Sequence, residues 1–233
     1  MFNLPETFIN TVKSLYHNAT TQVVVNSFLS DPYKITFGIR QGDPLSCVLF
    51  DLAIEPLACL IRKDTNFKGI SLPGEGEPLK AKFFADDTCV YMSKGDLFNL
   101  VTMILDDWCL VSGTKFNIEK TEVVPIGSEE HREQVVRMQR INQQDREGLD
   151  KHIKIAEDGS TIRFLGVWIR NKTNDTVPWE PVIDKINKHL EKWGTSYPSM
   201  LGRKIIIQAV VGGFTQFLTM AQGIPPNIED ALI

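Results

Sequence analysis

The sequence predicts an α+β protein, and three observations point to that class. Runs rich in β-branched and aromatic residues come in close pairs joined by short turns, which is typical of antiparallel hairpins. Segments with apolar residues three and four positions apart lie between these pairs and predict helices. Residues 178–233 carry mainly helical patterns, so we expect an antiparallel sheet backed by helices, followed by a separate helical segment.

The chain is expected to begin with a helix and two strands. Apolar spacing from Phe8 to Tyr16 predicts a helix over 6–16. The β-rich runs at 20–26 and 33–38 predict two strands, which a turn at Ser30-Asp31-Pro32 would connect.

A sharp break at Gly42-Asp43-Pro44 precedes the most apolar helix that we expect. Ser46 is placed to cap this helix, and its apolar residues from Val48 to Ile61 surround it almost completely. A helix of this kind is usually buried. The Gly- and Pro-rich residues 64–79 that follow predict a loop with at most one short strand.

The centre of the chain carries a hairpin signature. Two β-rich runs, Ala81–Ala85 and Thr88–Ser93, are separated only by Asp86-Asp87. Apolar residues from Leu97 to Val111 then predict an amphipathic helix that ends at Gly113.

The remaining chain alternates strand-like, polar and helical stretches. Residues 116–126 and 161–170 predict strands, and the polar stretch 128–159 between them is expected to be loop-like and mobile. Two helical patterns follow. On this basis we divide the chain into 1–177 and 178–233.

Composition and charge exclude several classes of protein. Apolar residues make up 42% of the chain and charged residues 23%, which is typical of a globular protein and excludes a disordered chain. With 25 basic and 29 acidic residues the net charge is −4, so any nucleic-acid site must be local. Neither a signal peptide nor an uninterrupted membrane span is visible, and we expect an intracellular protein.

The Asp86-Asp87 pair is the first candidate for chemistry. Two carboxylates at the tip of a hairpin suit Mg²⁺, which prefers oxygen ligands together with substrate phosphates. A surface role is the alternative, and the chain offers an example of it. Asp106-Asp107 is also an aspartate pair, but it falls in a helical pattern where a solvated face is expected.

The segment Gly38–Ser46 is the second candidate. Its glycines let the backbone approach a ligand closely, and the helix N-terminus that follows favours anions. Gln41 offers both a donor and an acceptor to a base or a sugar. A tight strand-to-helix turn explains the same residues equally well.

Four motifs follow one another along the chain: Gly38–Ser46, Phe84–Asp87, Ser112–Glu122 and Phe164–Ile169. In this order and spacing they resemble the palm of a reverse transcriptase, specifically that of non-LTR (LINE-type) retroelements. The resemblance extends to 1–37, ahead of the first motif, and to 178–226, which resembles the thumb. It implies a partial reverse-transcriptase palm over 1–177, followed by a helical thumb over 178–233.

The resemblance implies an RNA-directed DNA polymerase that uses Mg²⁺ or Mn²⁺, an RNA template, a DNA primer and deoxynucleoside triphosphates, in the cytoplasm or the nucleus. Asp86 matches the carboxylate that binds the catalytic metals, and Asp87 matches its partner. Lys120 matches the lysine proposed to protonate the leaving pyrophosphate, although an ordinary exposed lysine on a strand is the alternative.

Two further groups of residues match binding segments of the family. The incoming nucleotide and its template base would lie against Arg40, Gln41, Gly42 and Pro44. The primer end would be gripped by Phe164, Leu165 and Gly166, which would otherwise be read as part of a core strand.

One departure from the family pattern decides what we expect of the isolated chain. The family supplies a further metal-binding aspartate from an Asp-x-x-x-Ala-Phe/Tyr-Asp type motif, shortly before the helix that matches 6–16. The fingers would lie upstream as well. Because Asp43, Asp51 and Glu55 are no obvious replacement, we expect weak metal binding and no polymerisation.

Two alternatives stay open beside a polymerase domain. The chain could be a nucleic-acid-binding remnant that keeps the grip without the chemistry, or a decayed element without activity.

Overall fold

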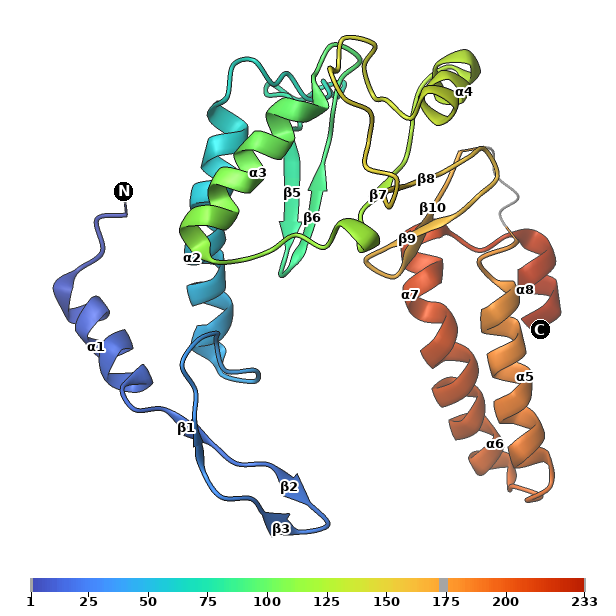
Figure 1. The fold of residues 1–233 in the computed structure, drawn as a ribbon. Coiled ribbons are helices and arrows are strands. Elements are labelled where there is room, and N and C mark those ends of the chain that lie inside the picture. Colours follow the sequence, from blue (N-terminus) through green and yellow to red (C-terminus); the bar gives the residue numbers. More distant parts are fainter. Residues whose placement is uncertain (1, 172–175, 233) are drawn as a thin grey trace. The chain divides into compact units, whose positions relative to one another are not determined.

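The computed structural model describes residues 2–171 and 176–232 and confirms an α+β fold (Figure 1). The residues group into two compact units. Unit 1 comprises Met1–Thr65 and Ile70–Tyr91, and unit 2 comprises Asn66–Gly69 and Met92–Ile233. The predicted palm and thumb ranges divide the chain differently, at a boundary close to residues 172–175, which lie outside the described residues. That division stays a prediction.

Strands in the described part of the chain form five two-stranded pairs, of which four are antiparallel. The fifth pair, β7 (Glu122–Val123) with β8 (Lys154–Ile155), is parallel. This pair departs from the antiparallel arrangement predicted for the sheet, because the chain between its strands makes a helical crossover.

Unit 1 begins with helix α1 (Glu6–Tyr16), whose bounds confirm the predicted helix. Four short strands follow: β1 (Thr20–Thr21), β2 (Val24–Val25), β3 (Phe28–Leu29) and β4 (Tyr33–Lys34). Strand β1 pairs with β4 and β2 pairs with β3, so the chain reverses at Asn26-Ser27.

The turn predicted at Ser30-Asp31-Pro32 is therefore wrong. Asn26 and Ser27 both have positive φ, 49° and 67°, which is the backbone of a two-residue hairpin turn with the natural strand twist. Ser30 instead bonds across the hairpin, where its N–H donates to the Val23 carbonyl at 2.9 Å.

Helix α2 (Pro44–Lys63) is capped by Asp43, whose carboxylate accepts from Leu45 N–H at 2.9 Å. The predicted Ser46 cap is wrong. Ser46 lies inside the first turn of the helix, and its hydroxyl donates to the Arg40 carbonyl at 2.5 Å. An aspartate directly before a proline at the first helical position is a stronger start signal than the serine three residues later.

Helix α2 is only partly covered, in contrast to the predicted burial. It buries Leu57, Ala58 and Ile61, but Val48 and Leu60 are about half exposed. By length and composition alone, α2 and the helix Met200–Gln222 could each cross a membrane. Core helices of globular proteins have the same length and composition, and α2 packs against the adjacent strand β5 (Ala81–Phe84).

Strand β5 forms a hairpin with β6 (Asp87–Val90). At the far end of this hairpin, the Lys80 ammonium donates to the carbonyl oxygens of Arg62 and Asp64 at 3.0 and 2.6 Å. These bonds satisfy carbonyl groups at the C-terminus of α2 and tie the helix to the strand.

Unit 2 begins its regular structure with α3 (Phe98–Ser112), which ends at Gly113 as predicted, with a φ of 72°. The strand predicted over 116–126 is wrong for most of its length. It contains the 3₁₀ turn η1 (Ile118–Lys120), and within it only β7 is a paired strand. The polar stretch 128–159 is not a loop throughout, because it contains helix α4 (Glu129–Met138), which buries Val135.

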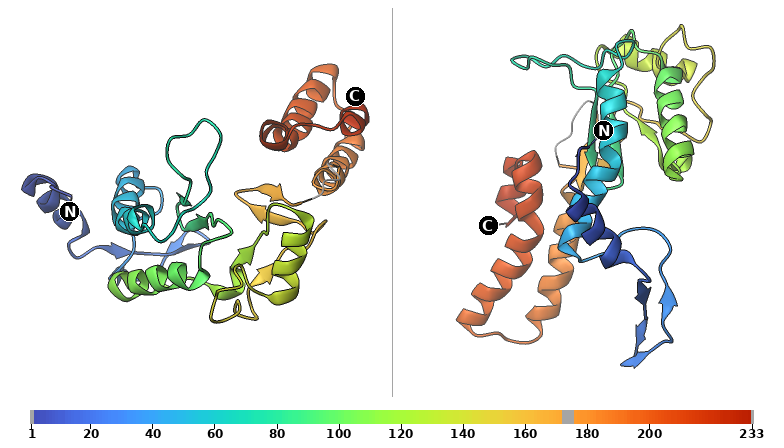
Figure 2. Two further views of the ribbon diagram at one scale, coloured as in Figure 1. Left: turned by 90° about the horizontal axis from the view of Figure 1, so that it is seen from above. Right: turned by 90° about the vertical axis from the view of Figure 1, so that its left-hand side faces the viewer.

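The rest of unit 2 is a hairpin and a helical layer. Strands β9 (Ile162–Phe164) and β10 (Val167–Ile169) form the hairpin. The layer consists of α5 (Glu180–Gly194), α6 (Met200–Ile207), the π-helical turn η2 (Gln208–Gly212), α7 (Gly213–Gln222) and α8 (Pro226–Leu232). Helices α5 and α7 lie side by side (Figure 2). Trp179, Leu218 and Ile228 form their common core.

Candidate functional site

The Asp86-Asp87 pair lies at the tip of the β5–β6 hairpin. Phe84 pairs with Asp87, so the two-residue turn is Ala85-Asp86 and not the predicted Asp86-Asp87. Ala85 has a φ of +49°, a conformation that is unusual for a residue with a Cβ. Both carboxylates are exposed to solvent, one in the turn and one on the first residue of β6.

Tyr91 follows β6 and continues the ladder, because its N–H donates to the Lys80 carbonyl at 2.8 Å. Burial, assisted by a hydrogen bond with Cys89, raises the pKa of Tyr91 to about 12. The phenol therefore stays protonated and uncharged well above neutral pH.

The exposed carboxylate oxygens at the tip are the type of donor that a divalent cation such as Mg²⁺ prefers. Two adjacent carboxylates supply hard ligands, and such a cation keeps water or phosphate oxygens in its remaining positions. Across residues 2–171 and 176–232, no group of three or more His, Cys, Asp or Glu side chains gathers as a metal cage.

Two other acidic residues of unit 1 already have partners. Glu55 forms an ion pair with Arg62 and accepts a bond from the Cys59 thiol at 3.3 Å. Asp43 is occupied as the cap of α2. Both contacts are local to α2.

The Gly38–Ser46 turn also lies in unit 1. Gly38 and Gly42 both have a φ of +87°, and a Cβ at either position would meet no atom within 4 Å. Glycine is therefore needed there for its backbone conformation and not for close packing inside this unit. Gln41 and Pro44 are exposed.

Arg40 holds the start of this turn against helix α1. One of its Nη atoms donates to the Leu15 carbonyl at 2.9 Å, and its guanidinium lies over the Tyr16 ring at 5.4 Å. A guanidinium has five N–H donors, so these contacts leave donors for a ligand.

The other predicted site residues lie in unit 2. Lys120 is exposed at the end of the 3₁₀ turn η1, not on a strand. Phe164 ends β9, and Leu165-Gly166 forms the turn of the β9–β10 hairpin with φ values of 49° and 84°. Positive φ at both positions is typical of a type I′ turn.

Helix α7 supports this second hairpin near its turn. A Cβ at Gly166 would lie 3.0 Å from Cε1 of Phe217, so the glycine backbone sits directly against that ring. The Gln222 side-chain amide donates to the Trp168 carbonyl at 2.8 Å and accepts from its N–H at 3.4 Å.

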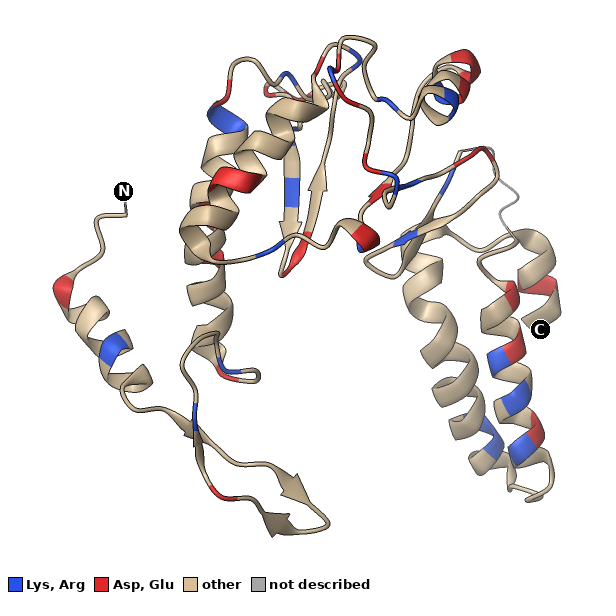
Figure 3. Ribbon diagram, in the orientation of Figure 1, with Lys and Arg blue, Asp and Glu red and all other residues tan. Residues whose placement is uncertain are grey.

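The basic residues of α5 do not form an unbroken positive stripe. Figure 3 shows acidic and basic residues interleaved along this helix. The Lys185 ammonium lies over the Phe214 ring at 4.3 Å, which gives this lysine a packing role as well as a charge.

The sequence pattern did not identify three polar anchors of unit 2. Asp96 is fully buried, and its carboxylate accepts from the N–H groups of Lys68, Gly69 and Ser93 at 2.7 to 2.9 Å. Burial by itself would raise the pKa of Asp96, but these backbone donors outweigh it and lower the pKa. Asp145 is also buried, and it accepts from Phe98 N–H at 2.8 Å.

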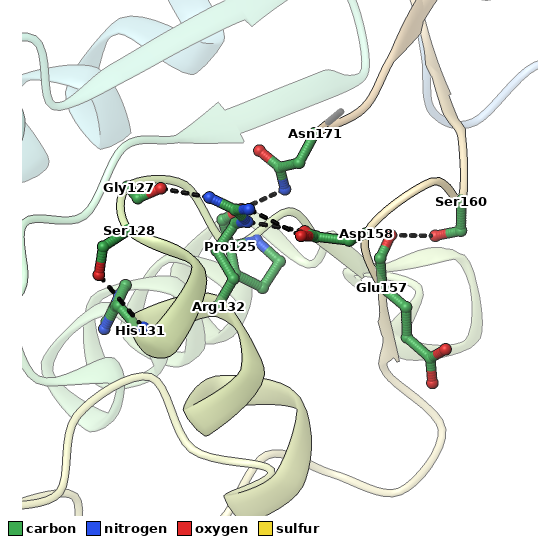
Figure 4. Close-up of polar contacts among 9 residues, drawn as sticks. All are labelled: Pro125, Gly127, Ser128, His131, Arg132, Glu157, Asp158, Ser160 and Asn171. Carbon is green, nitrogen blue, oxygen red and sulfur yellow. Dashed lines mark hydrogen bonds and ion pairs between the residues drawn. The ribbon is translucent and has the colours of Figure 1, made fainter. Parts of the chain in front are cut away.

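The third anchor is the ion pair of Arg132 with Asp158, which has two contacts of 2.7 Å (Figure 4). This pair raises the pKa of Arg132 further above its ordinary value. The role of Asp96 could have been predicted from its position just before the start of a helix. The Arg132–Asp158 pair joins residues 26 positions apart, so no local sequence pattern indicates it.

Comparison with known proteins identifies the family. The sequence profile of the family described as reverse transcriptase (RNA-dependent DNA polymerase) matches residues 1–169. The Transposon TX1 uncharacterized 149 kDa protein of Xenopus laevis is 37% identical over 93 residues, which are 40% of this chain and 7% of that relative. The chain thus spans a small part of the relative's length. The chain belongs to the reverse transcriptase family, because the family profile covers well over half of it.

Proposed function

We propose that the tip of the β5–β6 hairpin holds the catalytic cation of an RNA-directed DNA polymerase. The observation that carries this proposal is the pair of exposed carboxylates, Asp86 in the hairpin turn and Asp87 at the start of β6, inside the segment that the family profile matches. The complete protein would extend a DNA 3′ end on an RNA template with deoxynucleoside triphosphates. It would act in the cytoplasm or the nucleus.

The roles of the remaining residues follow from their chemistry. Bound Mg²⁺ or Mn²⁺ would neutralise phosphate charge and favour the deprotonated primer hydroxyl. Gln41 and the open backbone at Gly42 would contact the nucleotide and its template base, with Arg40 and Pro44 shaping that turn. The exposed ammonium of Lys120 would donate a proton to the leaving pyrophosphate.

The primer end would lie against the turn of the β9–β10 hairpin. Phe164 would supply an aromatic side chain and Leu165 an exposed apolar one, and Gly166 would let the turn pack against Phe217 while it presents these residues. Helices α5 to α7 would form the thumb beside this hairpin.

Metal binding tests the proposal directly. In a Mn²⁺ titration followed by electron paramagnetic resonance, we expect Asp86→Asn to weaken binding about tenfold, because a neutral amide replaces an ionic ligand. Asp106→Asn is the matched control, since Asp106 belongs to the exposed aspartate pair on α3. Equal binding by the Asp86→Asn and Asp106→Asn variants would overturn the assignment of the hairpin.

We expect the 233-residue chain by itself to bind Mn²⁺ weakly and not to extend a primer. Two carboxylates supply fewer ligands than a two-metal site uses. Primer extension by the purified chain would contradict this expectation. Binding of an RNA–DNA hybrid that is unaffected by Asp86→Asn but falls steeply with salt would instead favour a nucleic-acid-binding remnant.

A further inference from the structure

We propose that Arg132 and Asp158 are positioning residues for the primer end, because they fix the open end of the β9–β10 hairpin. The inference rests on the proposed function, in which the turn of this hairpin contacts the primer. It concerns neither a metal ligand nor a residue of the turn itself.

The segment from Pro125 to Arg132 contacts the chain on both sides of the hairpin (Figure 4). Before β9, Asp158 receives two hydrogen bonds from the Arg132 guanidinium, at Nε and Nη, each 2.7 Å long. After β10, the Asn171 side-chain amide donates to the Pro125 carbonyl at 2.6 Å. The two sides are also joined directly, since Gly159 N–H donates to the Asn171 carbonyl at 3.2 Å.

Arg132 is the centre of this arrangement. It lies in the first turn of α4, where Ser128 caps the helix by accepting from His131 N–H. Its remaining Nη atom donates to the Gly127 carbonyl, so one side chain bonds both its own loop and the chain before β9. A planar guanidinium that bonds a carboxylate through two nitrogens fixes direction as well as distance.

The Arg132–Asp158 pair is more sheltered than its neighbour on the β7–β8 strands. The side chains of Arg132 and Asp158 are 12% and 23% exposed, whereas those of Lys154 and Glu122, which form a single contact of 3.1 Å, are 58% and 30% exposed. An exposed single-contact pair holds little fixed geometry. Lys154 therefore provides a matched control for the loss of one basic charge in the same unit.

The two ends of the hairpin are held by different elements of unit 2. Phe217 of α7 packs against the turn and Gln222 of α7 bonds Trp168 in the middle of β10, whereas the Arg132–Asp158 and Asn171–Pro125 bonds hold the open end. Without the Arg132–Asp158 bonds, the open end is held on one side only, by Asn171, and the hairpin can tilt about its contacts with α7. The direction in which Phe164 and Leu165 present themselves to a primer therefore depends on Arg132.

The experiment compares the affinity of the full chain for two RNA–DNA hybrids of equal length, one with a recessed DNA 3′ end and one blunt. Fluorescence anisotropy gives both dissociation constants. We expect the wild-type chain to prefer the recessed end. Arg132→Ala and Asp158→Asn should lower this preference about tenfold while the affinity for the blunt hybrid stays within about twofold.

Further variants separate positioning from loss of the fold. Arg132→Lys keeps the charge with a single donor group, and we expect an intermediate preference. The Arg132→Ala, Asp158→Asn double variant should lose less than the sum of the two single losses, because both changes remove the same pair of hydrogen bonds. Lys154→Ala should behave as wild type.

The remaining outcomes overturn the inference in distinguishable ways. If the Arg132 variants keep the preference for the recessed end, the pair does not position the hairpin. If the Arg132 variants lose affinity for both hybrids equally, Arg132 has only a structural role. If the wild-type chain shows no preference for a recessed end, the proposed contact between this hairpin and the primer fails, and the positioning role fails with it.

Discussion

The two compact units differ in how much apolar surface they bury. Among the described residues, the buried apolar side chains of unit 1 are Ala19, Leu57, Ala58 and Ile61. Those of unit 2 are Phe67, Val101, Val135, Leu149, Ile153, Ala156, Ile162, Trp179, Ile186, Val210, Leu218 and Ile228. Unit 2 therefore has a core of its own, whereas unit 1 depends mainly on one helix packed against one hairpin.

Unit 1 also exposes apolar side chains that a core would normally cover. In the β2–β3 hairpin, which carries no charged residue in Figure 3, Val24, Phe28 and Leu29 are 65%, 80% and 65% exposed. The carboxylates proposed to bind metal thus lie in the unit with the smaller core. The hairpin proposed to grip the primer lies in the unit whose own packing holds it.

Among the substitutions that test the difference between the two units, we expect the largest change in unfolding free energy at Asp96. Asp96→Ala removes the acceptor of three buried N–H groups and should lower the free energy of unfolding of unit 2 by about 3 kcal/mol. Urea unfolding followed by tryptophan fluorescence reports this unit, since all four tryptophans, Trp108, Trp168, Trp179 and Trp193, belong to it. Asp106→Ala is the control, with a change within about 0.5 kcal/mol.

The same carboxylate predicts a loss of stability in acid. The pKa of Asp96 is lower in the folded state than its ordinary value of about 4, so its stabilising contribution is present above that value. The contribution is lost as the pH falls through the lower, folded-state pKa. Asp96→Asn should therefore flatten the dependence of unfolding free energy on pH in this range. An unchanged dependence would contradict the assigned role.

The second effect is expected at the turn of the β9–β10 hairpin. Gly166→Ala adds a Cβ 3.0 Å from the Phe217 ring at a residue with positive φ, so we expect a loss of about 2 kcal/mol. Gly159→Ala has the same backbone conformation but open space around the new Cβ, and should lose about 1 kcal/mol. If both variants lost the same unfolding free energy, the contact between Gly166 and Phe217 of α7 would have no effect on stability.

Local signals explain which elements the sequence predicts correctly. Apolar spacing places α1 at Glu6–Tyr16, and a glycine that can adopt positive φ ends α3 at Gly113. The reversal at Asn26-Ser27 is harder to predict, because Ser30-Asp31-Pro32 carries the stronger turn composition and the pairing of β1 with β4 decides the register. The pairing of β1 with β4 cannot be predicted from the local composition alone.

Long-range contacts explain the errors in unit 2. Helix α4 is polar on most of its surface and buries one apolar residue, Val135, so its sequence resembles a loop. The pair of Arg132 with Asp158 holds its first turn, and this pair forms only in the folded chain. The resemblance predicted Asp86, Asp87 and the Phe164–Gly166 turn as site residues. The contacts of the β9–β10 hairpin with Phe217, and of the chain before it with Arg132, belong to no sequence motif.

The smallest effect is expected at the turn of the β5–β6 hairpin, where Ala85 adopts a φ of +49°. Ala85→Gly relieves about 1 kcal/mol of backbone strain in the folded state. Glycine also raises the conformational entropy of the unfolded chain, which costs slightly less stability than the strain relief returns. Unit 1 should therefore become no less stable. Ala81→Gly on β5 is the control, because that residue lies in a regular strand and glycine should cost about 0.5–1 kcal/mol there. Urea unfolding followed by far-ultraviolet circular dichroism measures both variants.

We expect Ala85→Gly to bind Mn²⁺ more weakly than wild type even though it is equally stable. Glycine widens the range of conformations open to the turn, and unit 1 has little core with which to restrict them. The strained alanine would then limit where the carboxylates of Asp86 and Asp87 can lie. A variant that keeps both its stability and its Mn²⁺ affinity would show instead that the hairpin ladder alone orients the pair, and that the small core of unit 1 is sufficient for the site.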